Sequence, residues 1–335
     1  MQMETKVHYQ NFVNWAKDKP EVLVLSADLT GSTEIDLFRD TYPERFFSMG
    51  IAEQNMLSFA GGLAREGFVP FVHTFAVFIY RRAYDQIAMS VSYPNLPVKM
   101  FGFLPGITTP GGATHQAVED ISVLRSLPNI TILECGDATD VESVAEVAYR
   151  TPGPVYVRML RGEIPRLFSP RDPMRLGSNR IISRGDDIAI LTSGICTEEA
   201  LRVSHAVKKR GIGVTHIHVT TLKPFNDPEV LAAIRRARLG VITMENHSVI
   251  GGLGSSAAEL MAKHGVGKRL LRIGLNDTYA HGASRRYLMK EYEIDAAALV
   301  RRVEELVQAE LHITEAELAE VYLAPVHSAA REEAL

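Results

Sequence analysis

The feature that most constrains the fold of this chain is a regular alternation of short apolar runs with longer amphipathic segments. Five runs in the first half have the length and composition of buried strands: residues 22–25, 69–75, 98–103, 130–134 and 155–159. Between them lie segments whose apolar residues recur at helical spacing: residues 52–65, 118–126 and 140–150. Strands that are apolar throughout and alternate with helices predict a parallel sheet covered by helices on both faces.

The alternation is interrupted once and then resumes. Residues 165–185 contain three Pro, two Gly and five Arg with little periodicity, which is typical of a linker between domains. A second series follows, with strands predicted at 188–192, 214–219, 241–244 and 270–273 and helices at 197–210, 228–238, 254–264 and 295–309. The length of 335 residues gives room for two such domains.

We therefore predict an α/β fold of two consecutive αβα domains, each built on a parallel sheet. The first domain is expected at residues 1–168 and the second at 187–310, joined by a linker at 169–186. Residues 311–335 are expected to form a helical tail with an acidic end.

The composition is that of an ordinary globular protein, with 46% hydrophobic and 23% charged residues and a net charge of -4. No basic tract with interleaved aromatic residues is present, so we expect no nucleic-acid partner. We also expect no membrane partner, because no apolar run approaches the ~20 residues that cross a bilayer. The two cysteines, Cys135 and Cys196, lack the spacing of metal ligands and are expected to be buried thiols. We expect a cytoplasmic location by default, and the first ten residues, which contain no apolar run, are not expected to be a signal peptide.

A carboxylate and a nearby aromatic pair form the most suggestive local pattern. Glu53 lies in the run Gly50-Ile51-Ala52-Glu53-Gln54-Asn55, and Phe75 and Phe78 follow some twenty residues later. A carboxyl group in apolar surroundings favours its neutral form, so it can share a proton with a flat basic heterocycle that stacks on the rings. The residue types alone are equally compatible with a Glu at a helix end and with core phenylalanines.

These residues occur among several motifs whose order matches a known family. The motifs are Ser26-Ala27-Asp28-Leu29, Gly50-Ile51-Ala52-Glu53-Gln54-Asn55-Met56, Thr74-Phe75 with Phe78, Thr114-His115-Gln116, Leu124-Arg125-Ser126-Leu127-Pro128-Asn129 and Gly251-Gly252-Leu253-Gly254. Over residues 6–306 the chain resembles the C-terminal half of transketolases and of the related deoxyxylulose-phosphate synthases. The resemblance implies a first domain that binds the pyrimidine ring of thiamine diphosphate, followed by a transketolase C-terminal domain.

The part of the family that holds the diphosphate and its Mg²⁺ has no counterpart in this chain. That part carries a Gly-Asp-Gly motif and a downstream Asn, whereas Gly185-Asp186-Asp187 lacks the second Gly and lies in the other domain. The resemblance therefore implies a split transketolase, in which a separate N-terminal subunit supplies the Mg²⁺ site and this chain supplies no metal ligand. It also implies an α2β2 heterotetramer, with homodimerisation of this chain and active sites at contacts between the two kinds of subunit.

The resemblance assigns cofactor contacts to five residues. Glu53 matches the carboxyl group that hydrogen-bonds the ring nitrogen N1′ and promotes the imino form of the aminopyrimidine. Phe75 and Phe78 match the aromatic residues that stack on the pyrimidine. Tyr80 and Leu29 match further cofactor neighbours.

Substrate contacts are implied as well. His115 matches a histidine that hydrogen-bonds the donor C1 hydroxyl or carbonyl oxygen, where charge develops, so Glu53 and His115 are the expected catalytic residues. Arg161 matches a phosphate-binding arginine, with Arg158 as the neighbouring alternative, and Ser32 matches a hydroxyl on the sugar phosphate. Lys6 falls near a further family arginine. Asp28 is expected either at a subunit contact or as a strand-end cap.

Two positions depart from the family pattern. Phe103 stands among the substrate contacts where transketolases have a histidine, and Gly112 stands where an Asp recognises a sugar hydroxyl. Loss of an acidic group from a polyol site redirects hydroxyl recognition. We therefore expect a branched, deoxy, sulfonated or otherwise altered ketose phosphate.

The expected activity is transfer of a two-carbon ketol unit from a ketose phosphate to an aldose. Three alternatives remain: the β subunit of a 2-oxo-acid dehydrogenase, an acyloin-forming enzyme similar to deoxyxylulose-phosphate synthase, and a non-catalytic scaffold subunit. The Thr114-His115-Gln116 motif favours the transketolase over the dehydrogenase. Retention of Glu53, Phe78 and His115 argues against a scaffold. The Gly251-Gly252-Leu253-Gly254 run is interpreted as a tight turn and subunit contact, not as a nucleotide site.

Overall fold

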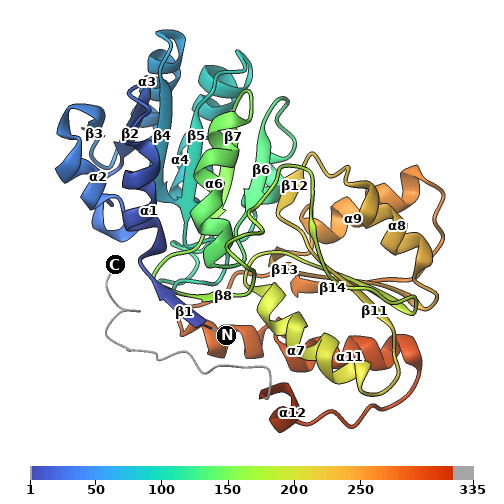
Figure 1. The fold of residues 1–335 in the computed structure, drawn as a ribbon. Coiled ribbons are helices and arrows are strands. Elements are labelled where there is room, and N and C mark those ends of the chain that lie inside the picture. Colours follow the sequence, from blue (N-terminus) through green and yellow to red (C-terminus); the bar gives the residue numbers. More distant parts are fainter. Residues whose placement is uncertain (1, 320–335) are drawn as a thin grey trace.

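Two sheets organise residues 2–319, the part of the chain that the computed structural model describes (Figure 1). The first sheet has seven strands in the order β12-β6-β7-β5-β4-β2-β3. Six of them run parallel to their neighbours: β2 (Val22–Ser26), β3 (Phe46–Ser48), β4 (Val69–Phe75), β5 (Lys99–Phe103), β6 (Thr131–Glu134) and β7 (Val155–Met159). The residues of β2, β5, β6 and β7 are all buried, as expected for a parallel sheet covered on both faces.

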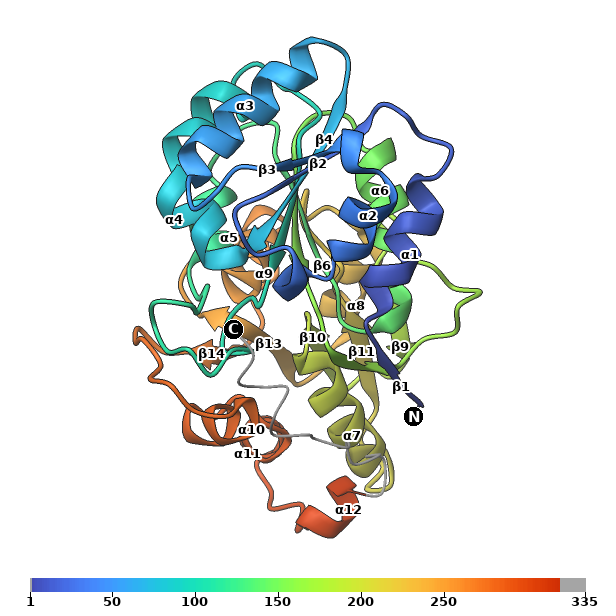
Figure 2. The same ribbon diagram turned by 90° about the vertical axis from the view of Figure 1, so that its left-hand side faces the viewer.

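Helices cover both faces of this first sheet. Figure 2 shows the sheet between α3, α4 and α5 on one side and α1, α2 and α6 on the other. The helices are α1 (Val7–Ala16), α2 (Asp36–Thr41), α3 (Glu53–Arg65), α4 (Ala76–Gln86), α5 (Asp120–Leu124) and α6 (Ala138–Arg150). A π-helical segment, η3 (Ile87–Ser92), continues α4, and short 3₁₀ turns form at η1 (Gly31–Thr33) and η2 (Pro43–Arg45). The helix expected at residues 118–126 corresponds to α5, which is shorter and spans only Asp120–Leu124.

The second sheet has five strands in the order β14-β13-β10-β11-β9. Four run parallel: β10 (Ile188–Thr192), β11 (Val214–His218), β13 (Gly240–Ser248) and β14 (Leu270–Leu275). The helices are α7 (Cys196–Lys208), α8 (Pro228–Arg236), α9 (Leu253–Lys263), α10 (Arg285–Glu291), α11 (Ala296–Val307) and α12 (Glu315–Ala319). In Figure 1, α8 and α9 lie on one face of this sheet and α7 and α11 on the other. These two αβα units with largely parallel sheets confirm the predicted fold class.

The segment expected as a linker contains ordered structure. β9 (Arg180–Ser183) lies within residues 169–186 and pairs antiparallel with β11, as an edge strand of the second sheet. Arg180 is 9% exposed, and its guanidinium forms an ion pair with Asp140 of α6. The connection between the two domains therefore packs against both of them.

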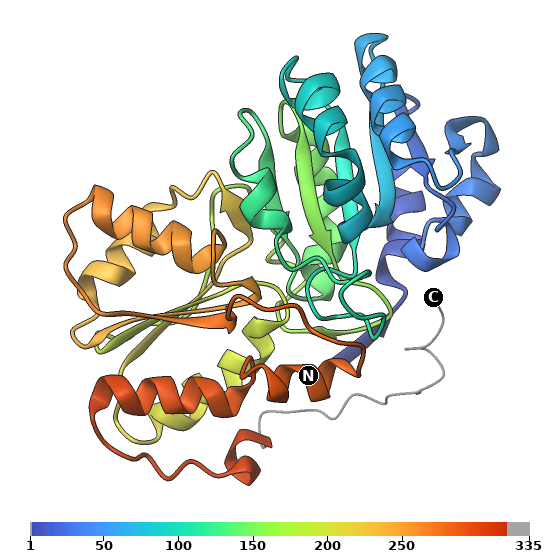
Figure 3. The same cartoon turned by 180° about the vertical axis from the view of Figure 1, so that it is seen from behind.

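Two further strand pairs tie the chain together. β12 (Thr221–Lys223) follows β11 in the second domain but pairs antiparallel with β6, so it becomes the edge strand of the first sheet. At the other end, β1 (Gln2–Thr5) pairs antiparallel with β8 (Glu163–Arg166). Figure 3 shows the two domains side by side, with the loop after β5 at their junction.

The expected C-terminal tail is described only in part. Residues 311–319 include the short helix α12, and the remainder of the predicted tail, residues 320–335, lies outside the described residues. Within residues 2–319, no helix has the length and apolar composition needed to cross a bilayer.

Candidate functional site

The candidate residues lie at one edge of the first sheet. Asp28 follows β2, Glu53 follows β3, Phe75 ends β4, His115 lies in the loop after β5, and Arg161 follows β7. The carboxyl ends of parallel strands meet at the same edge, where open α/β sheets form their ligand sites.

Glu53 is the first residue of α3 and its side chain is buried. The residue is 3% exposed, although it stands at a helix terminus. One of its oxygens, Oε1, accepts a hydrogen bond from Nη1 of Arg82 at 2.6 Å. This ion pair offsets the free energy that removing the carboxylate from water requires.

Phe75 and Phe78 lie at a direct transition from strand to helix. Phe75 ends β4 and caps α4, and Phe78 stands in the first turn of that helix. Their ring centroids are 5.7 Å apart and the rings are inclined by 26°, in a stacked arrangement. Phe75 is 1% exposed, whereas Phe78 is only partly buried. Phe78 is therefore the ring of the pair that lies nearer the surface.

His115 joins these rings from the loop after β5. Its ring centroid lies 5.5 Å from that of Phe78 and 6.4 Å from that of Phe75. Its Nδ1 lies 2.9 Å from the hydroxyl of Thr114. A Cβ at Gly111 would come within 2.9 Å of the His115 Cβ, so the loop requires glycine there. The structure thus brings His115 to the two phenylalanine rings, and Arg82 links Glu53 to Phe78.

An arginine that the sequence did not single out holds the His115 loop. The Arg81 guanidinium donates to the carbonyl oxygen of Ala113 at 2.7 Å and to that of Gln116 at 3.4 Å. It also forms a two-point ion pair with Glu119 at 2.8 and 2.9 Å. Arg81 therefore fixes the backbone on both sides of His115.

The second domain supports the same loop. The side-chain amide of Gln116 is buried and donates to the carbonyl oxygen of His281 at 3.3 Å. Gly112 has a φ of +71°, and a Cβ there would lie 3.2 Å from the backbone nitrogen of Gly282. The departure from the family Asp at Gly112 therefore coincides with close packing of two backbone segments.

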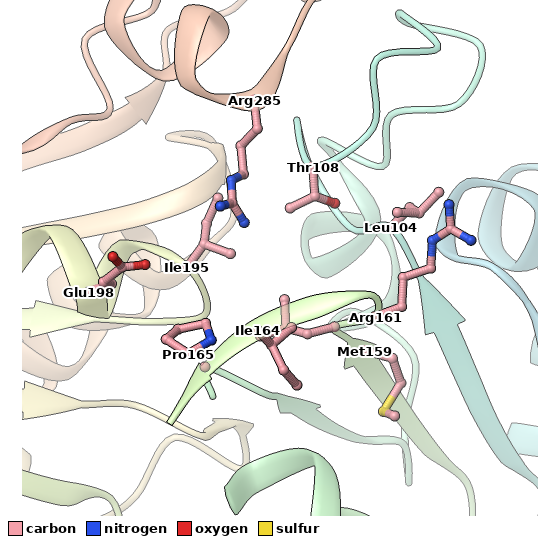
Figure 4. Close-up of a pocket in the computed structure, with 11 residues that line it drawn as sticks. Leu104, Thr108, Met159, Arg161, Ile164, Pro165, Ile195, Glu198 and Arg285 are labelled. Carbon is pink, nitrogen blue, oxygen red and sulfur yellow. The ribbon is translucent and has the colours of Figure 1, made fainter. Parts of the chain in front are cut away.

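Arg161 lies at the edge of the site, beside the phenylalanine pair. Its guanidinium donates to the carbonyl oxygen of Ser32 at 2.8 Å and lies 5.9 Å from the Phe75 ring centroid. Burial lowers the pKa of Arg161, and the nearby Glu34 carboxylate opposes that shift. Arg161 also borders a cavity of about 60 Å³ between the domains, which Arg285 of α10 lines from the other side (Figure 4).

Three predicted or alternative site residues face elsewhere. Phe103 is completely buried, with its ring 5.5 Å from that of His8, so the expectation of a substrate contact does not match its position. Tyr80 lies on the side of α4 away from Phe78, since side chains two positions apart in a helix point in nearly opposite directions. Burial and the charges of Asp120 and Glu119 raise its pKa. Arg158, the alternative phosphate ligand, is fully buried within the protein.

The remaining predicted residues lie near the site edge. The Leu29 side chain is partly buried and packs against the core, while its carbonyl oxygen accepts the amide of Thr33 at 2.9 Å. Asp28 is exposed and has a φ of 59°. Lys6 has a φ of 49°, and its ammonium lies 5.1 Å from the Tyr9 ring centroid.

The glycine run is the capped start of a helix. Glu245 accepts hydrogen bonds from the backbone amides of Leu253 at 2.6 Å and Gly254 at 2.8 Å. A Cβ at Gly252 would lie 1.9 Å from the Glu245 carboxylate, so this approach requires glycine. Burial raises the pKa of Glu245 to about 8. The run thus serves the fold of the second domain.

The donor chemistry of the site fits an aminopyrimidine. Glu53 offers a buried carboxyl group and Phe78 offers a flat ring, and the Arg82 guanidinium, which lies 3.9 Å from the Phe78 ring centroid, contacts both. For metals, residues 2–319 contain no group of three or more His, Cys, Asp or Glu side chains that could hold an ion.

Comparison with known proteins places both domains. Residues 3–166 match the transketolase pyrimidine binding domain, and residues 177–299 match the transketolase C-terminal domain. A relative from Methanocaldococcus jannaschii, named "Putative transketolase C-terminal section", is 36% identical over 308 residues, covering 91% of this chain and 96% of that protein. The 6-deoxy-6-sulfo-D-fructose transketolase subunit of a Clostridium species is 36% identical, covering 88% and 92% of the two chains.

A solved structure gives the same result. It is described as a split gene transketolase in the form of an inactive beta4 tetramer. It superposes with a TM-score of 0.82 at 35% identity, covering 91% of this chain and 98% of that one. The chain therefore belongs to the transketolase family, with the pyrimidine-binding and C-terminal domains that form the C-terminal section of a split transketolase.

Proposed function

We propose that this chain is the pyrimidine-binding subunit of a split thiamine-diphosphate-dependent transketolase. With an N-terminal subunit, it transfers a two-carbon ketol unit from a ketose phosphate to an aldose. The observation that carries the proposal is the cluster of Glu53, Phe75, Phe78 and His115 at the carboxyl edge of the first sheet. Membership of the transketolase family supports the cofactor, and the cluster supports the side chains that bind it.

Glu53 and the two phenylalanines receive the cofactor ring in this proposal. When bound, thiamine diphosphate supplies an acidic carbon that becomes the nucleophile and then an electron sink. The buried Glu53 carboxyl group holds or shares a proton at the ring nitrogen, where low polarity strengthens the hydrogen bond. The Phe78 face and the Phe75 ring behind it orient the ring by stacking, which contributes about 1 kcal/mol beyond area burial.

His115 and Arg161 act on the sugar. An imidazole held beside the ring stack can hydrogen-bond the substrate oxygen at which charge develops. The Arg161 guanidinium is a planar donor suited to two-point binding of phosphate. Ser32, whose carbonyl oxygen accepts a bond from Arg161, lies beside that anion site.

The substrate is proposed to differ from the ordinary pentose phosphates. Gly112 provides no acid for a sugar hydroxyl, and Phe103 is turned into the core. The Clostridium relative is named for a sulfonated deoxyketose, which is consistent with an altered sugar here. We expect Arg161 to bind the anionic end of the sugar in either case.

The assembly is proposed to be a heterotetramer that works in the cytoplasm, with Mg²⁺ held mainly by the N-terminal subunit. Large apolar side chains are exposed around α3 and η3: Ile51 is 74% exposed, Met89 58% and Tyr93 80%. Exposed apolar side chains of this size favour a protein partner over solvent. The homologous beta4 tetramer is described as inactive, which supports a need for the other subunit.

The decisive test is a reconstituted ketol-transfer assay. The chain is mixed with its candidate N-terminal subunit, thiamine diphosphate and Mg²⁺ across a panel of ketose phosphates and a sulfonated ketose. We expect Glu53→Ala to lower turnover by about a hundredfold or more, because proton transfer contributes that much. Glu66→Ala, which removes an exposed carboxylate just after α3, is the matched control and should retain activity.

Two results would contradict the proposal. Equal turnover by Glu53→Ala and the wild type would remove Glu53 from the mechanism. Acyl transfer from a 2-oxo acid without any ketol transfer would favour the dehydrogenase alternative.

A further inference from the structure

Arg82 already contacts the two groups that the proposed function reserves for the pyrimidine ring. Its Nη1 donates to Oε1 of Glu53 at 2.6 Å, and its guanidinium carbon lies 3.9 Å from the centroid of the Phe78 ring. A guanidinium is planar, stacks on aromatic faces and presents its N–H groups as a fork to a carboxylate. An aminopyrimidine would engage the same two groups, through its ring face and through a hydrogen bond between its ring nitrogen and the carboxyl group.

The two ends of this ion pair differ in their freedom. The Glu53 side chain is 3% exposed, whereas that of Arg82 is 44% exposed. Glu53 cannot lose its partner without leaving a buried charge uncompensated. The Arg82 head can move into water, because almost half of its side chain is already there. Arg82 also directly precedes Ala83, where the backbone of α4 departs from helical geometry at φ -120° and ψ 25°.

The neighbouring Arg81 is held in place by more contacts than Arg82. Arg81 is held by two carbonyl oxygens and by the two-point ion pair with Glu119. Within the described part of the chain, the Arg82 guanidinium makes its ion pair with Glu53 and its ring contact with Phe78, and no other hydrogen bond holds it. The two adjacent arginines are therefore built for different tasks.

Building on the proposed function, we propose that Arg82 is an internal competitor for the pyrimidine site. In the subunit without cofactor, its guanidinium neutralises Glu53 and covers Phe78. The cofactor ring displaces it, taking over the hydrogen bond to Glu53 and the stack on Phe78. The buried Glu53 carboxyl group thus has a hydrogen-bond partner both before and after the cofactor binds. The subunit therefore stays folded in the absence of the cofactor.

The test measures binding by the full chain alone, with thiamine as the probe. Thiamine carries the pyrimidine ring without the diphosphate that the N-terminal subunit is proposed to hold. Calorimetric titration compares the wild type with Arg82→Gln and Arg82→Lys. Removing a half-exposed ionic competitor should tighten thiamine binding by about fivefold in Arg82→Gln. Arg82→Lys, which keeps the charge but loses the planar fork, should lie between the two.

Controls separate this proposal from the function on which it rests. Arg65→Gln removes an exposed arginine from the end of α3 and should bind thiamine as the wild type does. Equal dissociation constants for the wild type and both Arg82 variants would overturn the proposal that Arg82 competes for the site. If Glu53→Gln nevertheless lost thiamine binding, the assignment of Glu53 to the pyrimidine site would still stand. Absence of binding in every variant would also overturn the competitor, and the ketol-transfer assay would then judge the proposed function independently.

Discussion

Replacing Arg158 by methionine should destabilise the whole chain, because this guanidinium joins both domains through buried contacts. Arg158 is 0% exposed and forms ion pairs with Glu134 and, at 2.9 Å, with Asp120. Its Nη2 also donates to the carbonyl oxygen of Ala117 at 3.1 Å and to that of Asn246, in the second domain, at 3.0 Å.

The expected loss follows from the two carboxylates that would remain. Removing one partner of a buried ion pair typically costs about 3–5 kcal/mol. Asp120 would still accept the Tyr156 hydroxyl at 2.7 Å, but the second oxygen of Glu134 has no hydrogen-bond partner even now. We therefore expect Arg158→Met to lower the free energy of unfolding by about 4 kcal/mol, a large part of the 5–15 kcal/mol of an ordinary protein.

Urea-induced unfolding followed by circular dichroism measures this loss at pH 7. The double variant Arg158→Met with Glu134→Gln is the informative control, since it removes the stranded charge together with the guanidinium. It should recover part of the lost stability, which would show as non-additivity of the two substitutions. A loss below about 1 kcal/mol for Arg158→Met would refute the reasoning, because a surface arginine behaves in that way.

Two further substitutions address the site loop and the second domain. Arg81→Ala should free the His115 loop and lower kcat/KM about tenfold, which corresponds to 1.4 kcal/mol, while the urea midpoint changes little; a large fall in stability with unchanged kinetics would contradict this role. The pKa of Glu245 is raised from 4.5 to about 8, so between these pH values the folded state holds a proton that the unfolded state has already released. The free energy of unfolding therefore falls as pH rises through that window. Glu245→Gln should remove a slope of up to about 1.4 kcal/mol per pH unit from urea unfolding at pH 5, 6.5 and 8, and an unchanged slope would reject the assignment.

The sequence predicted most of the parallel strands and the residues at their carboxyl ends. Strands buried on both faces give continuous apolar runs, as in β2 and β10, which stand out from their surroundings. Once those strands are known, topology alone brings the residues that follow them to one sheet edge. Phe75 and His115 could therefore be expected at the same edge, whereas Glu53 follows the unpredicted strand β3 and its place beside them was implied only by the family resemblance.

Side-chain direction limited the rest of the site prediction. Side chains two positions apart in a helix point to nearly opposite sides, so Tyr80 faces away from Phe78 even though both belong to α4. Phe103 shares its strand face with Phe101, and both rings contact His8. The contact of Arg82 with Glu53 joins two elements far apart in the chain, and no local pattern signals it.

The short antiparallel strands escaped prediction for a different reason. β9 has four residues and β12 has three, which is too few for a periodic pattern to emerge. Their pairing is decided by the open edges of sheets formed elsewhere in the chain. The stretch between the domains consequently looked irregular although part of it is a strand.

The crossing of β12 onto the first sheet means that the first domain of this chain is incomplete without a strand from the second. A fragment that stopped at the linker would present the unpaired backbone of β6 to solvent, and such edges recruit strands from other molecules. It would also strip Arg158 of its carbonyl partner on Asn246. An isolated first domain that ends within residues 169–186 should therefore aggregate, whereas a chain that keeps β12 should not.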